Sequence, residues 1–235
     1  YWDNIGLLDS VFNSAVYKNT PVAIGGADAH TGWVNQAMLR KAGINDLTLE
    51  KADPGIKAGT VLTPYGKISG FVTEGAWDHV LSAIPPVDDE KIARAITAGA
   101  DVMNRFGLTA WMEPLSNIRP LSPSFNASPD RRNLGLLPAY VALAKAGKLT
   151  AHVSGLALVN INSSPAIVDD VIALREQFSQ AADIKLVGIK IFQDGVIEYP
   201  SQSAKLSQPY LNRPGYRGSE TLDKEKFCQL ISKAD

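Results

Sequence analysis

Residues 88–115 read DDEKIARAITAGADVMNRFGLTAWMEPL, a helical pattern followed directly by a strand pattern. The helical part opens on acidic residues, repeats its apolar residues at helical spacing and stops at Gly107, as an amphipathic helix does. The strand part, residues 109–115, is a short apolar run that carries Glu113 and ends around Pro114. A helix that leads into a buried strand is the repeating unit of parallel α/β sheets.

The same unit recurs further along the chain. Helical patterns follow at residues 136–146 and 165–182, and strand-like runs follow at residues 149–159 and 186–192. The order helix, strand, helix, strand, helix, strand predicts parallel βα units and therefore an α/β fold. A further strand-like run, residues 21–27, precedes them.

Two irregular segments interrupt this alternation. Residues 45–86 are punctuated by prolines and glycines, which predicts an insertion made of hairpins and loops. Residues 200–218 are rich in proline, serine and tyrosine, and in a barrel they would form a long loop at the catalytic face. Insertions of this kind tend to shape pockets.

The composition narrows the choice of partner. The chain carries 23 basic and 24 acidic residues, so it has no excess charge for nucleic acid or an acidic membrane. No apolar run approaches the roughly 20 residues of a membrane span. We therefore expect a small-molecule substrate, no nucleic acid and no membrane. The single cysteine, Cys228, leaves the compartment open, with the cytoplasm preferred over export.

Asp28 and His30 stand in a polar turn directly after the first strand-like run. On an extended segment they would point to the same side, where they could form an acid/base pair or contact one metal. The alternative is a helix N-terminus, with Asp28 or Thr31 as the cap and with Trp33 and Leu39 packed inward. Both interpretations stay open for Asp28, and the functional one is favoured for His30.

Lys190 lies inside the otherwise apolar run 186–192. An ammonium group is costly to bury, so such a lysine is normally paired, deprotonated or chemically modified. It could be a Schiff-base nucleophile, a metal ligand after carboxylation, or a side chain that reaches the strand end or pairs with an acid. Asp194 follows, either in a simple turn or at a functional position after the strand.

Other polar residues could also have either a functional or a structural role. Glu113 and His152 lie inside strand-like runs and could line a barrel mouth, although a lone buried histidine is more often a hydrogen-bonded core residue. His79 is expected at the surface. Glu74 lies next to a turn glycine and could belong to the insertion that closes the pocket. The chain has no P-loop, dinucleotide fingerprint, HExxH motif or Cys/His zinc cluster, so a nucleotide cofactor is not expected.

Together these motifs resemble a known family. Residues 28–39 resemble the Asp-Gly-His-x-x-Trp-x-Asn-x-x-x-Leu signature of the YtcJ-like amidohydrolases, amidohydrolase family 3. Residues 70–74 resemble their Gly-x-x-x-Glu segment, and residues 107–109 resemble their Gly-Ile-Thr. Residues 189–195 and 209–210 are similar to their Val-Lys-x-Phe-x-Asp-Gly and Pro-Tyr motifs. The resemblance covers nearly the whole chain in the right order.

The resemblance implies a fold, a reaction and a set of site residues. The fold is part of a (β/α)₈ TIM barrel of the metal-dependent hydrolase type, with residues 45–86 as the insertion. One or two divalent metals, expected to be zinc, would activate water against an amide-like or formamide-like C–N bond. Lys190 would be a metal ligand, in carboxylated form. We expect catalytic roles for Asp28, His30 and Asp194, and substrate-binding roles for Trp33, Asn35, Glu74 and Glu113.

The departures from the family are equally informative. The superfamily's His-x-His pair, its two later histidines and the aspartate of its last strand are absent, and three histidines cannot replace them. We therefore expect residues 1–235 to be an internal part of an amidohydrolase catalytic domain, inactive alone, and homo-oligomeric or self-associating through open strand edges. A Schiff-base lyase or aldolase using Lys190, and a non-catalytic binding or regulatory domain, stay open as alternatives.

Overall fold

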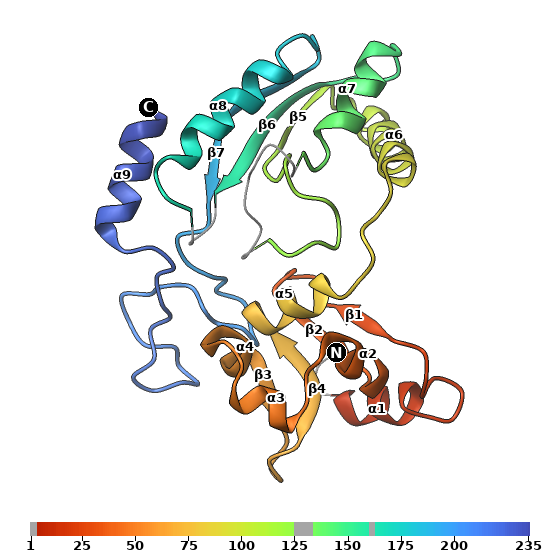
Figure 1. The fold of residues 1–235 in the computed structure, drawn as a ribbon, viewed down its shortest axis with the longest axis vertical. Helices are drawn as coiled ribbons and strands as arrows, with labels where there is room; N and C mark the ends of the chain where they lie inside the picture. Colours follow the sequence, from red (N-terminus) through yellow and green to blue (C-terminus); the bar gives the residue numbers. More distant parts are fainter. Residues whose placement is uncertain (1–3, 125–133, 160–162) are drawn as a thin grey trace. The chain divides into compact units, whose positions relative to one another are not determined.

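The computed structural model describes residues 4–124, 134–159 and 163–235, and it shows a mixed α/β protein (Figure 1). The chain divides into two compact units. Unit 1 consists of the residues up to Pro85 together with Asp194–Glu220, and unit 2 consists of Pro86–Gln193 together with Thr221–Asp235. Each unit has its own sheet and its own hydrophobic core.

Unit 1 contains a four-stranded antiparallel sheet in the order β1-β2-β4-β3. Its strands are β1 (Ala23–Gly25), β2 (Thr31–Val34), β3 (Thr60–Leu62) and β4 (Ile68–Thr73). Its helices are α1 (Ile5–Phe12), α2 (Gln36–Ala42), α3 (Asp46–Glu50), α4 (Pro54–Gly59) and α5 (Glu74–Ser82). Residues 45–86 thus carry three helices and the β3–β4 hairpin; their role as an insertion into a catalytic domain stays a prediction.

The sequence explains where α2 begins and ends. The Asn35 side chain accepts a hydrogen bond from the backbone amide of Met38, which satisfies a free donor at the helix N-terminus. Gly43 follows the helix with φ of 71°, the left-handed conformation that glycine adopts without strain. These two residues fix α2 directly after β2.

The core of unit 1 lies between α2, α5 and the sheet. Val34, Val72 and Val80 are fully buried, and Trp77 of α5 packs against β2. Gly32 makes this approach possible, because a Cβ atom at that position would lie 2.3 Å from the indole ring of Trp77. The turn between β1 and β2 therefore leads into a strand that packs closely against α5.

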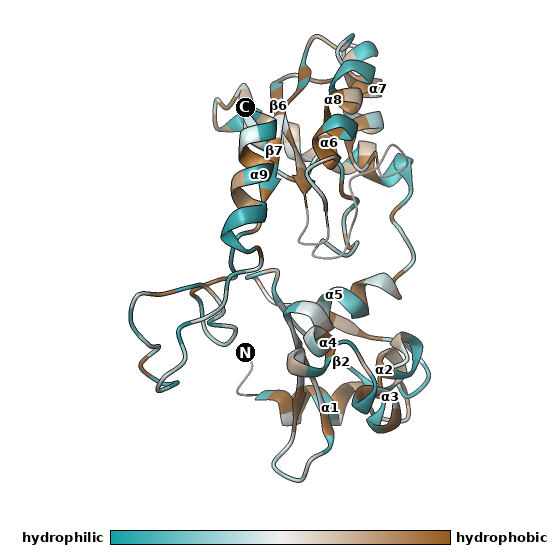
Figure 2. Cartoon of the chain, turned by 60° about the vertical axis from the view of Figure 1, so that its left-hand side comes forward, coloured by the Kyte–Doolittle hydropathy of each residue, from teal (hydrophilic) through white to brown (hydrophobic). Residues whose placement is uncertain are grey.

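Unit 2 contains a three-stranded parallel sheet in the order β5-β6-β7. The strands are β5 (Ala110–Glu113), β6 (His152–Val159) and β7 (Ile184–Ile191). The helices are α6 (Asp89–Arg105), α7 (Leu137–Lys145), α8 (Ile167–Gln177) and α9 (Lys224–Ala234). Figure 2 shows hydrophobic and hydrophilic residues alternating around α9, whose Leu230 is buried against α8.

The predicted βα units are confirmed by these elements. The three helical patterns correspond to α6, α7 and α8, and the strand-like runs that follow them correspond to β5, β6 and β7. Neither sheet closes on itself within the described residues, and β5 and β7 are the edges of the parallel sheet. Part of a barrel therefore stays a prediction. In the described part of the chain, no helix is both long and apolar enough to cross a lipid bilayer.

Candidate functional site

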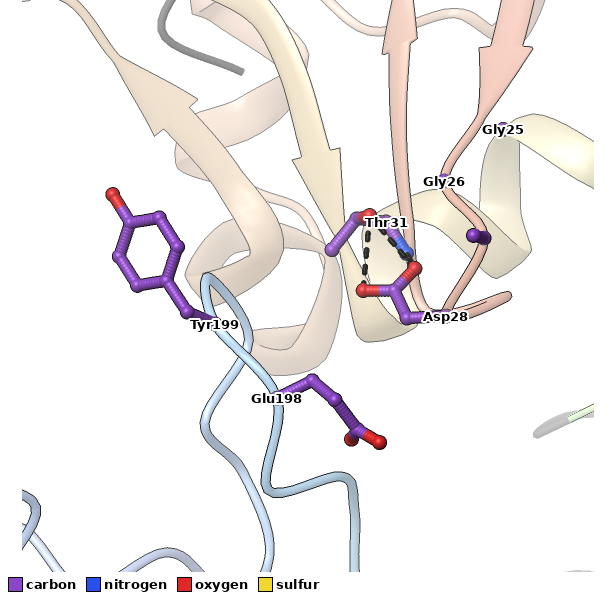
Figure 3. Close-up of a pocket in the computed structure, with 7 residues that line it drawn as sticks. Gly25, Gly26, Asp28, Thr31, Glu198 and Tyr199 are labelled. Carbon is purple, nitrogen blue, oxygen red and sulfur yellow. Dashed lines mark hydrogen bonds between the residues drawn. The ribbon is translucent and has the colours of Figure 1, made fainter. Parts of the chain in front are cut away.

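A pocket of about 680 Å³ lies in unit 1 (Figure 3). Its lining residues come from the turn after β1 and from the segment that contains residues 198 and 199. They are Gly25, Gly26, Ala27, Asp28, Thr31, Glu198 and Tyr199. Figure 3 shows the side chains of Glu198 and Tyr199 pointing in opposite directions from their segment. The lining therefore combines glycine and alanine backbone, two hydroxyl-bearing side chains and two carboxylates.

Asp28 organises the turn that forms one wall of this pocket. Its Oδ1 atom accepts a hydrogen bond from the backbone amide of His30 at 3.1 Å. The same atom accepts from the backbone amide of Thr31 at 3.1 Å and from the Thr31 hydroxyl at 2.8 Å (Figure 3). The alternative of a helix cap at Asp28 or Thr31 is wrong, because Thr31 opens strand β2. Ala29, inside the turn, has φ of 60°, a left-handed conformation that is strained for alanine.

His30 forms an ion pair with Glu74. Its Nδ1 atom lies 2.9 Å from Glu74 Oε2, and the side chains are only 12% and 28% exposed. An ionised carboxylate can only accept hydrogen bonds, so Nδ1 carries a proton whichever charge the ring has. The Glu74 backbone amide also donates to the His30 carbonyl oxygen at 2.7 Å. Glu74 thus holds both the side chain and the backbone of His30.

The surroundings of His30 favour its charged form. Burial lowers the pKa of His30, but the hydrogen bond and charge of Glu74 raise it. Asp28 and Glu198 raise the pKa further, and the net result is above the ordinary value of 6.5. His30 is therefore an imidazolium over a wider pH range than a free histidine.

Glu74 has a second hydrogen-bond partner, which the sequence alone does not predict. The Ser203 hydroxyl donates to Glu74 Oε1 at 2.6 Å, across 129 residues of chain. Glu74 is also the first residue of α5 with φ of 47°, which is an unfavourable conformation for a residue with a side chain. The sequence did not identify Ser203 as a site residue, because a serine in a serine-rich loop has no pattern that distinguishes it from its neighbours.

Lys190 lies in unit 2, on β7, where it is half-buried and paired in register with Leu158. Its Nζ atom lies 5.2 Å from the centre of the Phe192 ring. Among the described residues, no carboxylate lies within ion-pair distance of Lys190. Asp194 belongs to unit 1, and its Oδ2 atom accepts from the Lys205 backbone amide at 2.9 Å.

Glu113 ends β5 and is linked through Tyr140 to Trp111. The Tyr140 hydroxyl lies 3.4 Å from Glu113 Oε2, and the Trp111 indole donates to the same hydroxyl at 3.3 Å. Burial raises the pKa of Tyr140, so this phenol stays neutral. The three side chains border a second cavity of about 380 Å³, against α6.

Trp33 and Asn35 are fully buried. The Asn35 carbonyl oxygen accepts from the backbone amides of Val22 and Met38, and its amide donates to backbone carbonyls that include Phe12 and Thr20. Asn35 thus joins the end of α1, the segment before β1 and the start of α2. Substrate binding by Trp33, Asn35, Glu74 and Glu113 stays a prediction.

The other two histidines lie apart from these groups. His152 opens β6, so it lies at the amino end of the parallel sheet, whereas Glu113 lies at the carboxyl end of β5. The His152 side chain is 79% exposed, and its Nδ1 atom pairs with Asp183 at 3.1 Å. The expectation of a buried core histidine is therefore wrong, and a role in lining a barrel mouth stays a prediction. His79 was expected at the surface but is half-buried, and its Nε2 atom contacts the Ala42 carbonyl at 2.9 Å.

The described residues do not make a metal site by themselves. In residues 4–124, 134–159 and 163–235, no three histidine, cysteine, aspartate or glutamate side chains are grouped so that they could hold a metal ion. Structural and catalytic zinc sites in proteins use three or four such side chains.

Comparisons with known proteins identify the family. Residues 13–235 match the sequence model of the "Amidohydrolase family", and the chain belongs to this family. It is 26% identical over 222 residues to a Bacillus subtilis (strain 168) protein named "Putative amidohydrolase YtcJ". That alignment covers 93% of this chain and 37% of the relative, so the chain spans little more than a third of the relative's length.

Two solved structures share the fold. One is an uncharacterized metal-dependent hydrolase from Pyrococcus horikoshii OT3, with a TM-score of 0.56, 18% identity, and coverage of 91% of this chain and 37% of that one. The other, from Pyrococcus furiosus, has a TM-score of 0.53, 16% identity, and coverage of 91% and 38%. Both likenesses concern the arrangement of the backbone.

Proposed function

We propose that the chain is part of the catalytic domain of a metal-dependent hydrolase that cleaves a non-peptide, amide-like or formamide-like C–N bond. The observation that carries the proposal is the family match over residues 13–235. The names of the two similar structures, both metal-dependent hydrolases, support it. The family match also favours hydrolysis over Schiff-base chemistry at Lys190.

The cofactor in this proposal is a divalent metal, with zinc preferred. Such an ion lowers the pKa of bound water and polarises the scissile carbonyl. Lys190 is the described residue proposed to hold it, because carboxylation would convert a half-buried cation without an ion-pair partner among the described residues into an oxygen ligand. Because no group of three histidine, cysteine, aspartate or glutamate ligands occurs among the described residues, we propose that residues 1–235 are inactive alone.

The pocket of unit 1 is the proposed substrate-binding region. Asp28 and Glu198 give it negative charge, so it suits a neutral or cationic molecule better than an anionic one. His30 and Glu74 hold the turn that carries Asp28. We assign His30 and Asp28 to substrate positioning within this turn, and Asp194 stays a further catalytic candidate.

The fold supports two further parts of the proposal. Three consecutive parallel βα units are what part of a (β/α)₈ barrel would contain. The edges of β5 and β7 are open among the described residues, and an open edge is a site for strand pairing. We therefore propose a partial barrel that associates with a second copy of the chain.

The test is a hydrolysis assay on the complete product of the gene. Uncharged, cationic and anionic amides and formamides would be compared, with and without a metal chelator. We expect release of amine from uncharged or cationic substrates and loss of activity with chelator, restored by zinc. Hydrolysis that survives complete metal removal, or no hydrolysis of any C–N substrate by the metal-loaded protein, would overturn the proposal.

A further inference from the structure

The Ser203 side chain in unit 1 makes two hydrogen bonds and packs closely against the backbone of Gly195. Its hydroxyl donates to Glu74 Oε1 at 2.6 Å and accepts from the Val196 backbone amide at 3.1 Å. A Cβ atom on Gly195 would lie 2.0 Å from the Ser203 hydroxyl oxygen, so the backbone approaches this side chain closely. The hydroxyl therefore has one position and two defined partners.

The Glu74 carboxylate is consequently fixed at both oxygens. His30 Nδ1 lies on Oε2, and the Ser203 hydroxyl donates to Oε1. A hydrogen bond from a hydroxyl to an ionised carboxylate is shorter and stronger than one between neutral groups, and the 2.6 Å distance between Ser203 and Glu74 is in that short range. Two donors on different oxygens restrict rotation of the carboxylate, and Oε2 is thereby kept in contact with His30 Nδ1.

The loop that carries Ser203 also carries two residues of the pocket. Ser203 and Ala204 donate their backbone amides to the Val196 carbonyl at 2.8 and 3.0 Å, which closes a loop over residues 196–204. Glu198 and Tyr199 lie within this loop and line the pocket. The contact between Ser203 and Glu74 therefore fastens the base of the loop to the first residue of α5.

We propose that Ser203 is a positioning residue: through Glu74 it orients the His30 imidazole with its proton on Nδ1, and it anchors the loop that brings Glu198 and Tyr199 to the pocket. The inference rests on the proposed function in taking this pocket as the substrate-binding region. Its geometric content concerns the free protein and can be measured without substrate.

Ser201 provides a matched control two residues away. It is also buried, but its hydroxyl has no hydrogen-bond partner among the described residues. Ser201→Ala therefore removes a buried hydroxyl from the same loop without removing a bond to Glu74. Ser203→Thr keeps a hydroxyl at the position and serves as the conservative variant.

The experiment has two measurements on the 235-residue chain. Nitrogen-15 NMR of the histidine side chains, at a pH well above the His30 pKa, identifies which ring nitrogen of His30 carries the proton. Amide hydrogen exchange of residues 196–204 measures how firmly the loop is held. The spectra would be assigned by substituting His79 and His152. We expect the Nδ1–H form of His30 in the wild type, in Ser201→Ala and in Ser203→Thr. In Ser203→Ala we expect a shift toward the Nε2–H form and roughly tenfold faster exchange in the loop, the factor that one hydrogen bond to a charged group supports.

Two results would overturn the inference. One is a folded Ser203→Ala protein with the wild-type His30 nitrogen shifts and loop exchange; the other is an equal effect of Ser201→Ala. If Ser203→Thr does not fold, the comparison of the two alanine variants decides. Neither result depends on hydrolysis, so a protein that shows the predicted His30 shifts but cleaves no substrate would contradict the proposed function alone.

Discussion

Glu74 is joined to His30 twice, by its side chain at 2.9 Å from the imidazole Nδ1 and by its backbone amide at 2.7 Å from the His30 carbonyl oxygen. The sheet makes this possible, because Thr31 of β2 is the register partner of Thr73 of β4. The residues that immediately flank this pair, His30 and Glu74, therefore meet at one end of the sheet. Their contact fixes the turn that carries Asp28.

The first prediction concerns the pKa of His30. Glu74 raises it through a hydrogen bond and its charge, whereas burial lowers it. In Glu74→Gln the charge is lost and burial remains, so the His30 pKa should fall below its wild-type value. An NMR pH titration of the histidines measures this. Glu50→Gln, which removes an exposed carboxylate from α3 of the same unit, should leave the His30 pKa unchanged.

The second prediction is a pH dependence of stability. The pKa of His30 is higher in the folded protein than the ordinary value of 6.5, so protonation favours the folded state. The stabilisation is fully present below about pH 6.5 and is lost as the pH rises through the folded pKa. Urea unfolding of wild type and His30→Gln, compared at several pH values, should show a stability difference that shrinks with rising pH. A difference that grows would contradict the sign of this shift.

The third prediction uses the strained turn. Ala29 has φ of 60°, and the family signature that residues 28–39 resemble carries glycine at this position. Ala29→Gly relieves the strain but adds flexibility to the unfolded chain, so we expect a net stabilisation of about 0.5–1 kcal/mol. Ala98→Gly, in the exposed middle of α6, should instead cost about 1 kcal/mol. Denaturant unfolding of both variants checks the opposite signs.

The fourth prediction tests the packing beneath the turn. A methyl group at Gly32 would overlap the ring of Trp77, so Gly32→Ala should destabilise unit 1 by about 1–3 kcal/mol. Gly99→Ala, in α6, meets no atom within 4 Å and should stabilise unit 2 by up to about 1 kcal/mol through helix propensity. Thermal unfolding that shows no loss for Gly32→Ala would contradict the close approach of α5 and β2.

Much of unit 2 could be predicted because the spacing of apolar residues differs clearly between its helices and its strands. The long amphipathic pattern of α6 and the apolar run of β7 leave little choice between helix and strand. Strand β2 was missed because Thr31–Val34 is four residues long, fully buried and without alternation, and it follows a polar turn. In such a segment the neighbouring strands decide the structure.

The site was predictable only in part, for a related reason. His30 stood out as a polar residue in a turn after a strand, and Glu74 was a separate candidate in a different segment. Their pairing depends on the register of β2 and β4, and the contact of Glu74 with Ser203 depends on chain 129 residues away. No local pattern encodes either contact, so both needed the folded structure.

The most direct test of the central claim is the metal content of the complete gene product, purified with bicarbonate, for wild type, Lys190→Ala and Lys185→Ala. Lys185 is an exposed lysine of the same strand, so its loss should have no effect. We expect about one to two equivalents of divalent metal in wild type and Lys185→Ala, and a sharp reduction in Lys190→Ala. Equal metal in all three proteins would remove Lys190 from the site, and no metal in any of them would contradict a metal-dependent hydrolase.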